Sequence, residues 1–277
     1  MTPELRRARL LAAMDIDEWA PRALAVAAVE PPAISVAALV ESQVLPVSAP
    51  AALTIDAPVA LAEAPADAPS SPMADRRKSI AAMDWSALEA DASGCRACTL
   101  CASRKNVVFG VGPRTARLLV IGEAPGVDED ARGEPFVGQA GKLLDSMLAA
   151  IGLNRREHVY IANVLKCHPP ANRDPLPDEI HACSMYLARQ AELLAPDLVL
   201  LVGRFAAQAM LGSDVPIGRL RGRVHEFDLG GRRVPAVVSY HPAYLLRSPS
   251  EKAKTWADLC LAMDALQAAS AQAVGAD

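Results

Sequence analysis

Apolar residues recur along residues 94–277 in two patterns, one typical of buried strands and the other of amphipathic helices. Residues 118–121 are a continuous run of Leu, Leu, Val and Ile, which predicts a strand buried on both faces. Residues 138–151 carry apolar side chains at helical spacing and are followed by Gly152, a typical helix terminator. By the same patterns we expect further strands at 158–165, 198–202, 223–227 and 234–239, and further helices at 178–194, 205–211 and 255–266.

Strands that alternate with helices indicate a mainly parallel sheet with helices on both faces. The predicted fold is therefore a three-layer α/β/α sandwich with a mainly parallel four-stranded central sheet, its fourth core strand being the second arm of a hairpin around Gly230-Gly231. Ligands of such sheets bind beyond the carboxyl ends of the strands. Three segments follow strands directly and should share one cleft: 122–126, 163–167 and 239–246.

The first 90 residues differ in composition from the rest of the chain. Residues 20–75 are dominated by Ala, Pro and Val, and such a segment buries too little surface to offset its ordering entropy. We therefore divide the chain into a largely disordered extension with short helices (1–90), an α/β domain (91–270) and a disordered tail (271–277). The short helices, at 3–19 and 76–85, are suited to dock a partner protein or to pack on the core.

The targeting and membrane signals of the chain point to the cytoplasm. Residues 6–14 begin like a secretory signal, but Asp15 and Asp17 interrupt the apolar run and no small-residue cleavage site follows. No apolar run approaches the roughly 18 residues of a membrane span. We expect a cytoplasmic monomer that binds no membrane. In that compartment clustered cysteines indicate metal or redox chemistry before disulfides.

Charge is distributed unevenly along the 277 residues, although the net charge is only −4. Residues 217–254 contain 8 Lys and Arg against 3 Asp and Glu. This local excess suits a phosphate backbone, and it equally suits a solvated surface hairpin.

Five of the six cysteines flank the segment with the glycine-containing turn at 122–126: Cys95, Cys98 and Cys101 precede it, and Cys167 and Cys183 follow it. Four thiolates from two distant stretches suit either tetrahedral zinc or a [4Fe–4S] cluster, and their spacing does not separate the two. These five flanking cysteines are the candidate ligands. The sixth cysteine, Cys260, is explained as an ordinary buried thiol.

Polar and aromatic residues at the predicted strand ends are candidates for ligand binding. The turn Gly122-Glu123-Ala124-Pro125-Gly126 could cradle a phosphate with its backbone N–H groups, but it lacks the dinucleotide and NTP fingerprints. Phe136 lies in a loop, where an aromatic ring is suited to stack on a ligand. Asn163 offers a donor and an acceptor together, and His241 follows the last strand as a proton donor.

In their order along the chain, these motifs resemble the uracil-DNA glycosylase superfamily, most closely its iron–sulfur-containing family 4. The resemblance covers residues 94–267 and implies a monofunctional hydrolase of base excision repair that removes uracil from single- or double-stranded DNA. It also implies that Phe136 stacks on the flipped base, Asn163 reads its polar edge and His241 hydrogen-bonds O2. The remaining implied roles are a [4Fe–4S] cluster on Cys95, Cys98, Cys167 and Cys183, a base-stack wedge at Leu245 or Leu246, and a phosphate contact by Arg247.

Two residues depart from the patterns of the superfamily. Ala124 stands where its best-known members have a water-activating Asp, so we assign the orientation of water to Glu123, the nearest carboxylate. Cys101 is a thiol beyond the four required, and it forms an alternative C-x2-C pair with Cys98.

The loop from Asn172 to Glu179 lacks the basic, histidine-bearing sequence of members that cross-link to DNA. We therefore expect no covalent bond between the protein and DNA.

Two other classes of function fit parts of the sequence. A non-catalytic DNA- or replisome-associated module would use the same cleft for binding, and it agrees with Ala124 and with the long extension. A redox protein would use the cysteines for electron transfer, but it leaves the base-binding residues without a role.

Overall fold

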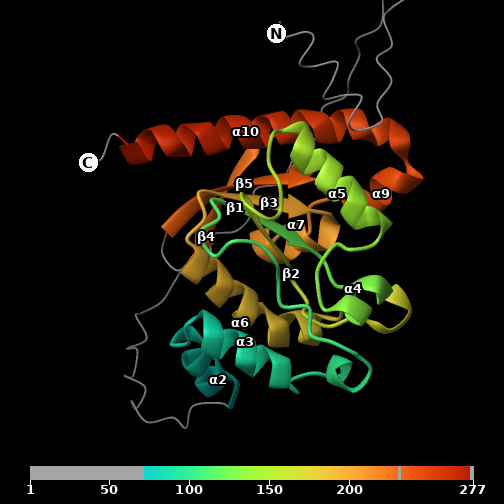
Figure 1. Cartoon of the computed structure of the whole chain (residues 1–277), viewed down its shortest axis with the longest axis vertical. Coiled ribbons are helices and arrows are strands. Elements are labelled where there is room, and N and C mark those ends of the chain that lie inside the picture. Colours follow the sequence, from blue (N-terminus) through green and yellow to red (C-terminus); the bar gives the residue numbers. More distant parts are fainter. Residues whose placement is uncertain (1–71, 230–231, 275–277) are drawn as a thin grey trace, which may run out of the picture. The chain divides into compact units, whose positions relative to one another are not determined.

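The structure is a computed structural model that describes residues 72–229 and 232–274. Its centre is a five-stranded sheet with the strand order β2-β1-β3-β5-β4 (Figure 1). Four strands are parallel, and β4 pairs antiparallel with β5 at one edge. The strands are β1 (Leu118–Gly122), β2 (Val159–Asn163), β3 (Leu198–Val202), β4 (Val224–Leu229) and β5 (Arg232–Ser239).

Helices cover both faces of the sheet, and alternate residues of β1 point into two separate apolar cores. Leu118 and Val120 belong to a core shared with α5, α9 and α10, whereas Leu119 and Ile121 face α6 and α7 (Figure 1). The helices are α2 (Pro72–Ala81), α3 (Trp85–Gly94), α4 (Val127–Arg132), α5 (Gln139–Ala150), α6 (Pro177–Leu194), α7 (Arg204–Leu211), α8 (Ile217–Leu220), α9 (Pro242–Arg247) and α10 (Lys252–Val274). Short 3-10 turns lie at η1 (Thr99–Ala102), η2 (Pro170–Asn172) and η3 (Pro249–Glu251).

The three-layer arrangement and the mainly parallel sheet confirm the predicted fold class. The predicted strand number of four was wrong, because the first arm of the hairpin is a full edge strand that pairs from Val224↔Val237 to Leu229↔Arg232. Beyond the carboxyl end of β2 the chain stays hydrogen-bonded to the segment that ends β1. The N–H groups of Val164 and Leu165 donate to the carbonyls of Gly122 and Glu123. The candidate residues are thereby held at one edge of the sheet.

Described helices run across both predicted boundaries of the α/β domain. α3 runs across the predicted boundary at 90/91, and Ile80 of α2 and Leu88 of α3 are buried in a third apolar core with Tyr186 of α6. α10 continues to Val274, into the tail expected to be disordered. The expectations for residues 1–71 lie outside the described residues. None of the helices in the described ranges is long and apolar enough to cross a bilayer.

Candidate active site

The predicted cleft is present as a pocket of about 480 Å³ at the carboxyl ends of the strands. The structure brings together residues that are far apart in the sequence, from the turns after β1, β2 and β5 and from the loop before α5. The predicted site residues that line the pocket are Glu123, Ala124, Pro125, Gly126, Phe136, Asn163, His241 and Arg247.

Asn163 presents an unused polar atom to this pocket. It is the last residue of β2 and only 1% exposed, and its Oδ1 accepts no hydrogen bond within the described part of the chain. A buried amide oxygen left without a donor is costly, so the site is built for a ligand that supplies one.

Gly122 makes room for both Asn163 and Phe136. A Cβ at Gly122 would lie 2.4 Å from Oδ1 of Asn163 and 2.6 Å from Cζ of Phe136. Such distances are far below van der Waals contact, so only glycine allows the amide and the ring to approach the same end of β1. The glycine of the predicted turn therefore acts by its lack of a side chain.

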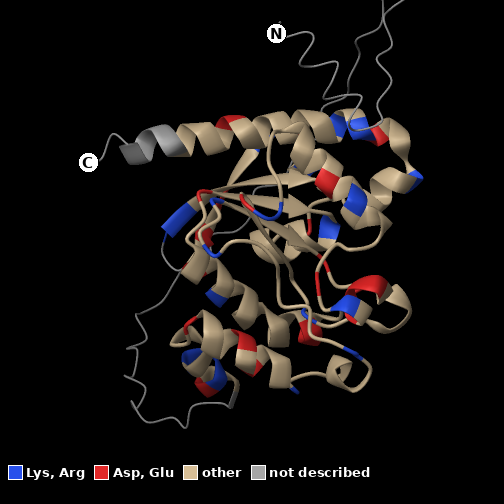
Figure 2. Cartoon of the chain, in the orientation of Figure 1, with Lys and Arg blue, Asp and Glu red and all other residues tan. Residues whose placement is uncertain are grey.

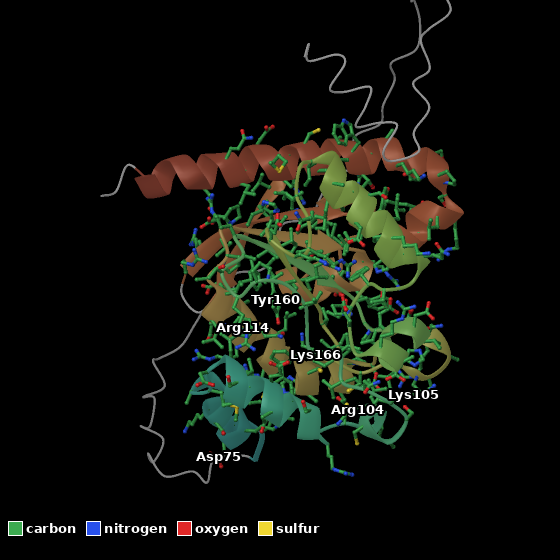
Figure 3. All side chains as sticks on the ribbon, viewed as in Figure 1. Asp75, Arg104, Lys105, Arg114, Tyr160 and Lys166 are labelled. Carbon is green, nitrogen blue, oxygen red and sulfur yellow. The ribbon has the colours of Figure 1, made fainter. Side chains whose placement is uncertain are left out.

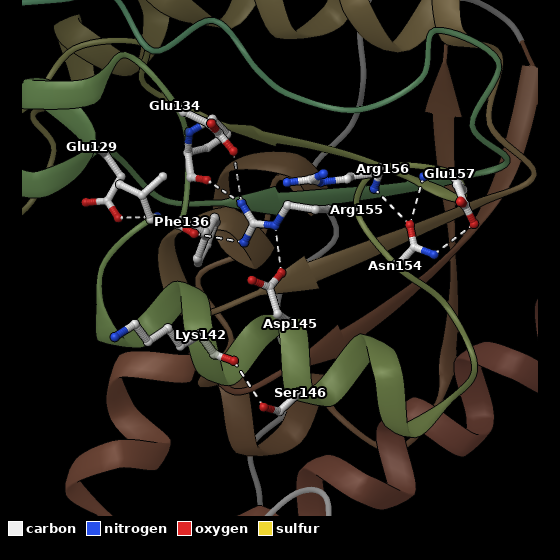
Figure 4. A network of polar contacts seen from close by, with 12 residues as sticks. Glu129, Glu134, Phe136, Lys142, Asp145, Ser146, Asn154, Arg155, Arg156 and Glu157 are labelled. Atoms are coloured by element: carbon white, nitrogen blue, oxygen red, sulfur yellow. Dashed lines mark hydrogen bonds and ion pairs between the residues drawn. The ribbon is translucent and has the colours of Figure 1, made fainter.

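Phe136 is held in a backbone conformation that non-glycine residues rarely adopt. Its φ is 55°, and its ring lies in the pocket with a centroid 5.5 Å from that of the His241 ring. Arg155 fixes this conformation by donating from Nη1 to the carbonyl of Pro135 (3.0 Å) and from Nη2 to the carbonyl of Phe136 (2.8 Å), as Figure 4 shows. The guanidinium is itself oriented by Asp145, whose Oδ1 lies 2.6 Å from Nε.

Glu129 of α4 holds the other side of the same loop. Its carboxylate accepts the N–H groups of Val137 and Gly138 at 2.9 and 3.1 Å and that of Gly126 at 3.0 Å. One carboxylate therefore joins the turn after β1 to the loop that carries Phe136. Arg155 donates hydrogen bonds to carbonyls of this loop, and Glu129 accepts hydrogen bonds from its N–H groups. The backbone is therefore held on both sides of the Phe136 ring.

His241 is neutral and carries its proton on Nε2. The residue caps α9, and its Nδ1 accepts the N–H of Ala243 at 3.1 Å, which leaves Nε2 as the protonated nitrogen. Burial, with the nearby Arg247 guanidinium, lowers the pKa of the imidazole to about 4. At neutral pH His241 therefore offers an uncharged N–H donor.

Glu123 is the carboxylate of the pocket that titrates near neutrality. Burial, together with the neighbouring Asp174, raises the pKa of Glu123 to about 7, against a smaller lowering by Arg204. A carboxylate with such a pKa is a competent general base near pH 7.

The basic residues of 217–254 are in part engaged in ion pairs. Arg221 pairs with the buried Asp258 of α10, and Lys254 pairs with Glu251. Basic residues (blue) stand near α9 and at the start of α10, while acidic residues (red) gather on α4 (Figure 2). Arg247, on the last turn of α9, is the basic residue of this range that lines the pocket.

The two leucines of α9 have different positions, and this corrects one prediction. Leu245 is 0% exposed and packs in the core shared by α5 and α10, so its side chain is not available to a base stack. Leu246 points outward and is 46% exposed. Helical geometry places consecutive residues on different faces, and here it leaves Leu246 as the surface residue.

The cysteines form a second site beside α3 and α6. Among the described residues no three His, Cys, Asp or Glu side chains converge on a point where they could hold a single metal ion. The five cysteines flanking the glycine turn instead border a common pocket with Arg104 and Lys166: Cys95, Cys98, Cys101, Cys167 and Cys183. Cys260 lies apart on α10.

The surroundings of these cysteines fit an anionic centre. Nη2 of Arg76 donates to Sγ of Cys95 and Nη1 of Arg104 donates to Sγ of Cys167, both at 3.2 Å. Arg104 and Lys166 are labelled in Figure 3, and Lys166 is fully buried. Burial raises the pKa of Cys167, and that of Cys183 to about 12, so these thiols need cations to ionise. Three cationic side chains meet that need.

Three residues that support the site were not found from the sequence. Glu129, Arg155 and Lys166 act through contacts to residues distant in sequence or to the backbone, and no local pattern marks them. Glu129 has a weak signal, since it stands three residues after Gly126 as in a capping box.

The fold and pocket define an α/β protein with a pocket lined by polar and aromatic residues at the carboxyl edge of its sheet, and with a cysteine site alongside. A family model described as the Uracil DNA glycosylase superfamily matches residues 109–260. The chain is 50% identical over 159 residues to a type-4 uracil-DNA glycosylase of Archaeoglobus fulgidus, an alignment that covers 56% of this chain and 79% of that protein.

A type-4 uracil-DNA glycosylase of Thermotoga maritima is 44% identical over 159 residues, which cover 57% of this chain and 81% of the relative. A type-5 uracil-DNA glycosylase of Pyrobaculum aerophilum is 32% identical over 148 residues, covering 48% and 64% of the two chains. The chain belongs to the uracil DNA glycosylase superfamily, within its type-4 branch.

Proposed function

We propose that the protein is a uracil-DNA glycosylase that hydrolyses the bond between uracil and deoxyribose and leaves an abasic site, the first step of base excision repair. The observation that carries this proposal is the buried, unpartnered Oδ1 of Asn163 beside the ring of Phe136. An amide edge next to an aromatic face is complementary to a nucleobase that has left the duplex.

The pocket distinguishes uracil from cytosine by hydrogen-bond polarity. Uracil presents an N3–H donor and an O4 acceptor, which match the Oδ1 acceptor and the amide N–H donor of Asn163. Cytosine reverses both groups, so its binding would leave two buried acceptors face to face and two donors likewise. Where a site is built around hydrogen bonds, a mismatch of this kind lowers kcat/KM for the wrong base by about 10⁴-fold.

In the hydrolysis, His241 and Glu123 act on opposite sides of the breaking bond. As N1 separates from C1′, the electron pair of the bond moves onto uracil, and the Nε2–H of His241 stabilises the developing charge at O2. A water molecule adds to C1′ and gives a proton to the carboxylate of Glu123. Because no lysine lines the pocket among the described residues, no Schiff base follows, and the reaction ends at the abasic site.

DNA binding is assigned to the rim of the pocket at α9. Leu246 is exposed and fills the space of the extruded base, while Arg247 contacts a phosphate. The cost of unstacking is a few kcal/mol, and it is smallest in a single strand, so single-stranded DNA is also a substrate.

We further propose that Cys95, Cys98, Cys167 and Cys183 hold a [4Fe–4S] cluster. Support comes from the cysteines that border a shared pocket and from the cationic side chains around them. When bound, the cluster supplies a cross-link between the loop before β1 and the loop after β2, and it takes no part in hydrolysis. Cys101 borders the same pocket as a spare thiol.

The test is uracil release from labelled oligonucleotides by the purified full-length chain, with abasic sites revealed by alkaline cleavage. We expect cleavage at uracil in single and double strands and none at cytosine or thymine. Asn163→Ala and His241→Ala should each lose at least 100-fold in rate with iron content unchanged. A brown, iron-loaded protein that leaves uracil in place would refute the catalytic proposal, and a colourless protein of full activity would refute the cluster.

A further inference from the structure

Lys166 is a buried cation between the two sites, and its contacts extend beyond the cysteines that it borders. Its side chain is 2% exposed and lies among the largest fully buried groups of the molecule, between the sheet and α3 (Figure 3). Burying an ammonium group is costly unless anions and acceptors surround it. The position therefore calls for a specific role.

The contacts of Lys166 reach both sites at once. Its Nζ donates to the main-chain carbonyl of Asn163 at 2.9 Å. Its own backbone N–H donates to Sγ of Cys183 at 3.2 Å, and its carbonyl accepts the N–H of Val108 at 2.8 Å. Lys166 also lines the cysteine pocket together with Cys167 and Cys183.

Asn163 depends on an exact backbone position. Its Oδ1 lies 2.4 Å from where a Cβ of residue 122 would be, so the amide fits only because Gly122 has no side chain. Asn163 is also the last residue of β2, after which the chain turns toward Cys167. The N–H side of the peptide that follows Asn163 is held by the bond from Val164 to the carbonyl of Gly122, and its carbonyl side is held by the ammonium of Lys166.

We propose that Lys166 is a positioning residue that couples the cysteine site to the base-reading amide of Asn163. The ammonium holds the carbonyl of Asn163, and anionic cysteines hold the ammonium. Occupation of the cysteine site thereby sets the orientation of the amide. This proposal rests on the proposed function for its effect on uracil, but its effect on the end of β2 stands apart from catalysis.

The experiment compares holoprotein with Lys166→Met, Lys166→Arg and Lys105→Met. Lys105 is an exposed lysine of the loop before β1 and provides a matched control (Figure 3). We expect Lys166→Met to retain iron, to exchange amide hydrogens faster over residues 163–165, and to lose roughly 10- to 100-fold in kcat/KM, the range for one charge-assisted hydrogen bond. Its inhibition by free uracil should weaken in parallel. Lys166→Arg should restore most of both properties, and Lys105→Met should change neither.

Two outcomes overturn the proposal. Exchange over residues 163–165 that is equal in wild type and Lys166→Met shows that the ammonium does not position Asn163. Faster exchange only in preparations that have lost iron shows that Lys166 acts by retaining the cluster. If Lys166→Met does not fold, Lys166→Gln, which keeps a polar but uncharged group, takes its place: exchange over residues 163–165 should be faster than in wild type, and equal exchange overturns the proposal. A wild-type protein inert on uracil refutes the proposed function alone, since the exchange comparison still tests Lys166.

Discussion

Replacing Arg155 by Met tests whether the loop of Phe136 is held by its guanidinium. The substitution keeps an unbranched apolar stem of similar reach and removes the donors to the carbonyls of Pro135 and Phe136. The Arg155 side chain is only 13% exposed, so water replaces those donors poorly.

The size of the effect follows from two opposing terms. Two charge-assisted hydrogen bonds at about 1.5 kcal/mol each, the low end of their range, give about 3 kcal/mol. Relaxation of Phe136 from φ 55° returns about 1 kcal/mol, the strain of a left-handed residue. The loop must then be restored to its bound conformation at a cost of about 2 kcal/mol, which corresponds to a loss of about 30-fold in kcat/KM.

The assay is single-turnover release of uracil from a single-stranded oligonucleotide, measured beside iron content and thermal unfolding. Arg156→Met is the matched control, because Arg156 is exposed and adjacent (Figure 4). A value of kcat/KM for Arg155→Met within threefold of wild type would refute the reasoning. So would an equal loss in Arg156→Met.

Three further results are expected. The rate should rise with pH through about 7, where the buried carboxyl of Glu123 ionises, and Glu123→Gln should give a low, flat profile between pH 5 and 9; a wild-type profile flat across pH 7 contradicts this assignment. Gly122→Ala should fold and bind iron yet lose activity, because its methyl group would meet the amide of Asn163; uracil release at the wild-type rate would exclude that clash. Asp258→Ala should lower the free energy of unfolding by about 3–5 kcal/mol, because it leaves Arg221 unpaired in a buried position; a denaturant midpoint no lower than that of Asp264→Ala, an exposed control, would exclude this.

The core strands were predictable because their signals are local. Residues 198–202 form β3 with the predicted bounds, since a continuous apolar run suits a strand covered on both faces. α2 gave a weaker signal, because much of its anchoring comes from Arg76, which contacts Cys95 and Tyr186 far along the chain. A helix fixed by such contacts cannot be read from its own periodicity.

The candidate site was predictable where residues follow strands and not where they support one another. Parallel topology alone brings Glu123, Asn163 and His241 to one edge of the sheet. The choice between Leu245 and Leu246 needed the rotation of α9 against the core. The role of Arg155 could not be predicted from the sequence, because its partners are main-chain carbonyls, which any residue provides.

Because of the strand order, uracil release requires the sheet to be completely folded. Asn163 ends β2 and His241 follows β5, and these two strands are separated in the sheet by β1 and β3. The amide and the imidazole therefore line one pocket only after four parallel strands have paired in register, and such non-local pairings form slowly. A chain still emerging from the ribosome, or one with β5 undocked, has no complete site. The rate of uracil release therefore measures the number of molecules whose sheet is fully assembled, and partly folded molecules cannot excise bases from DNA.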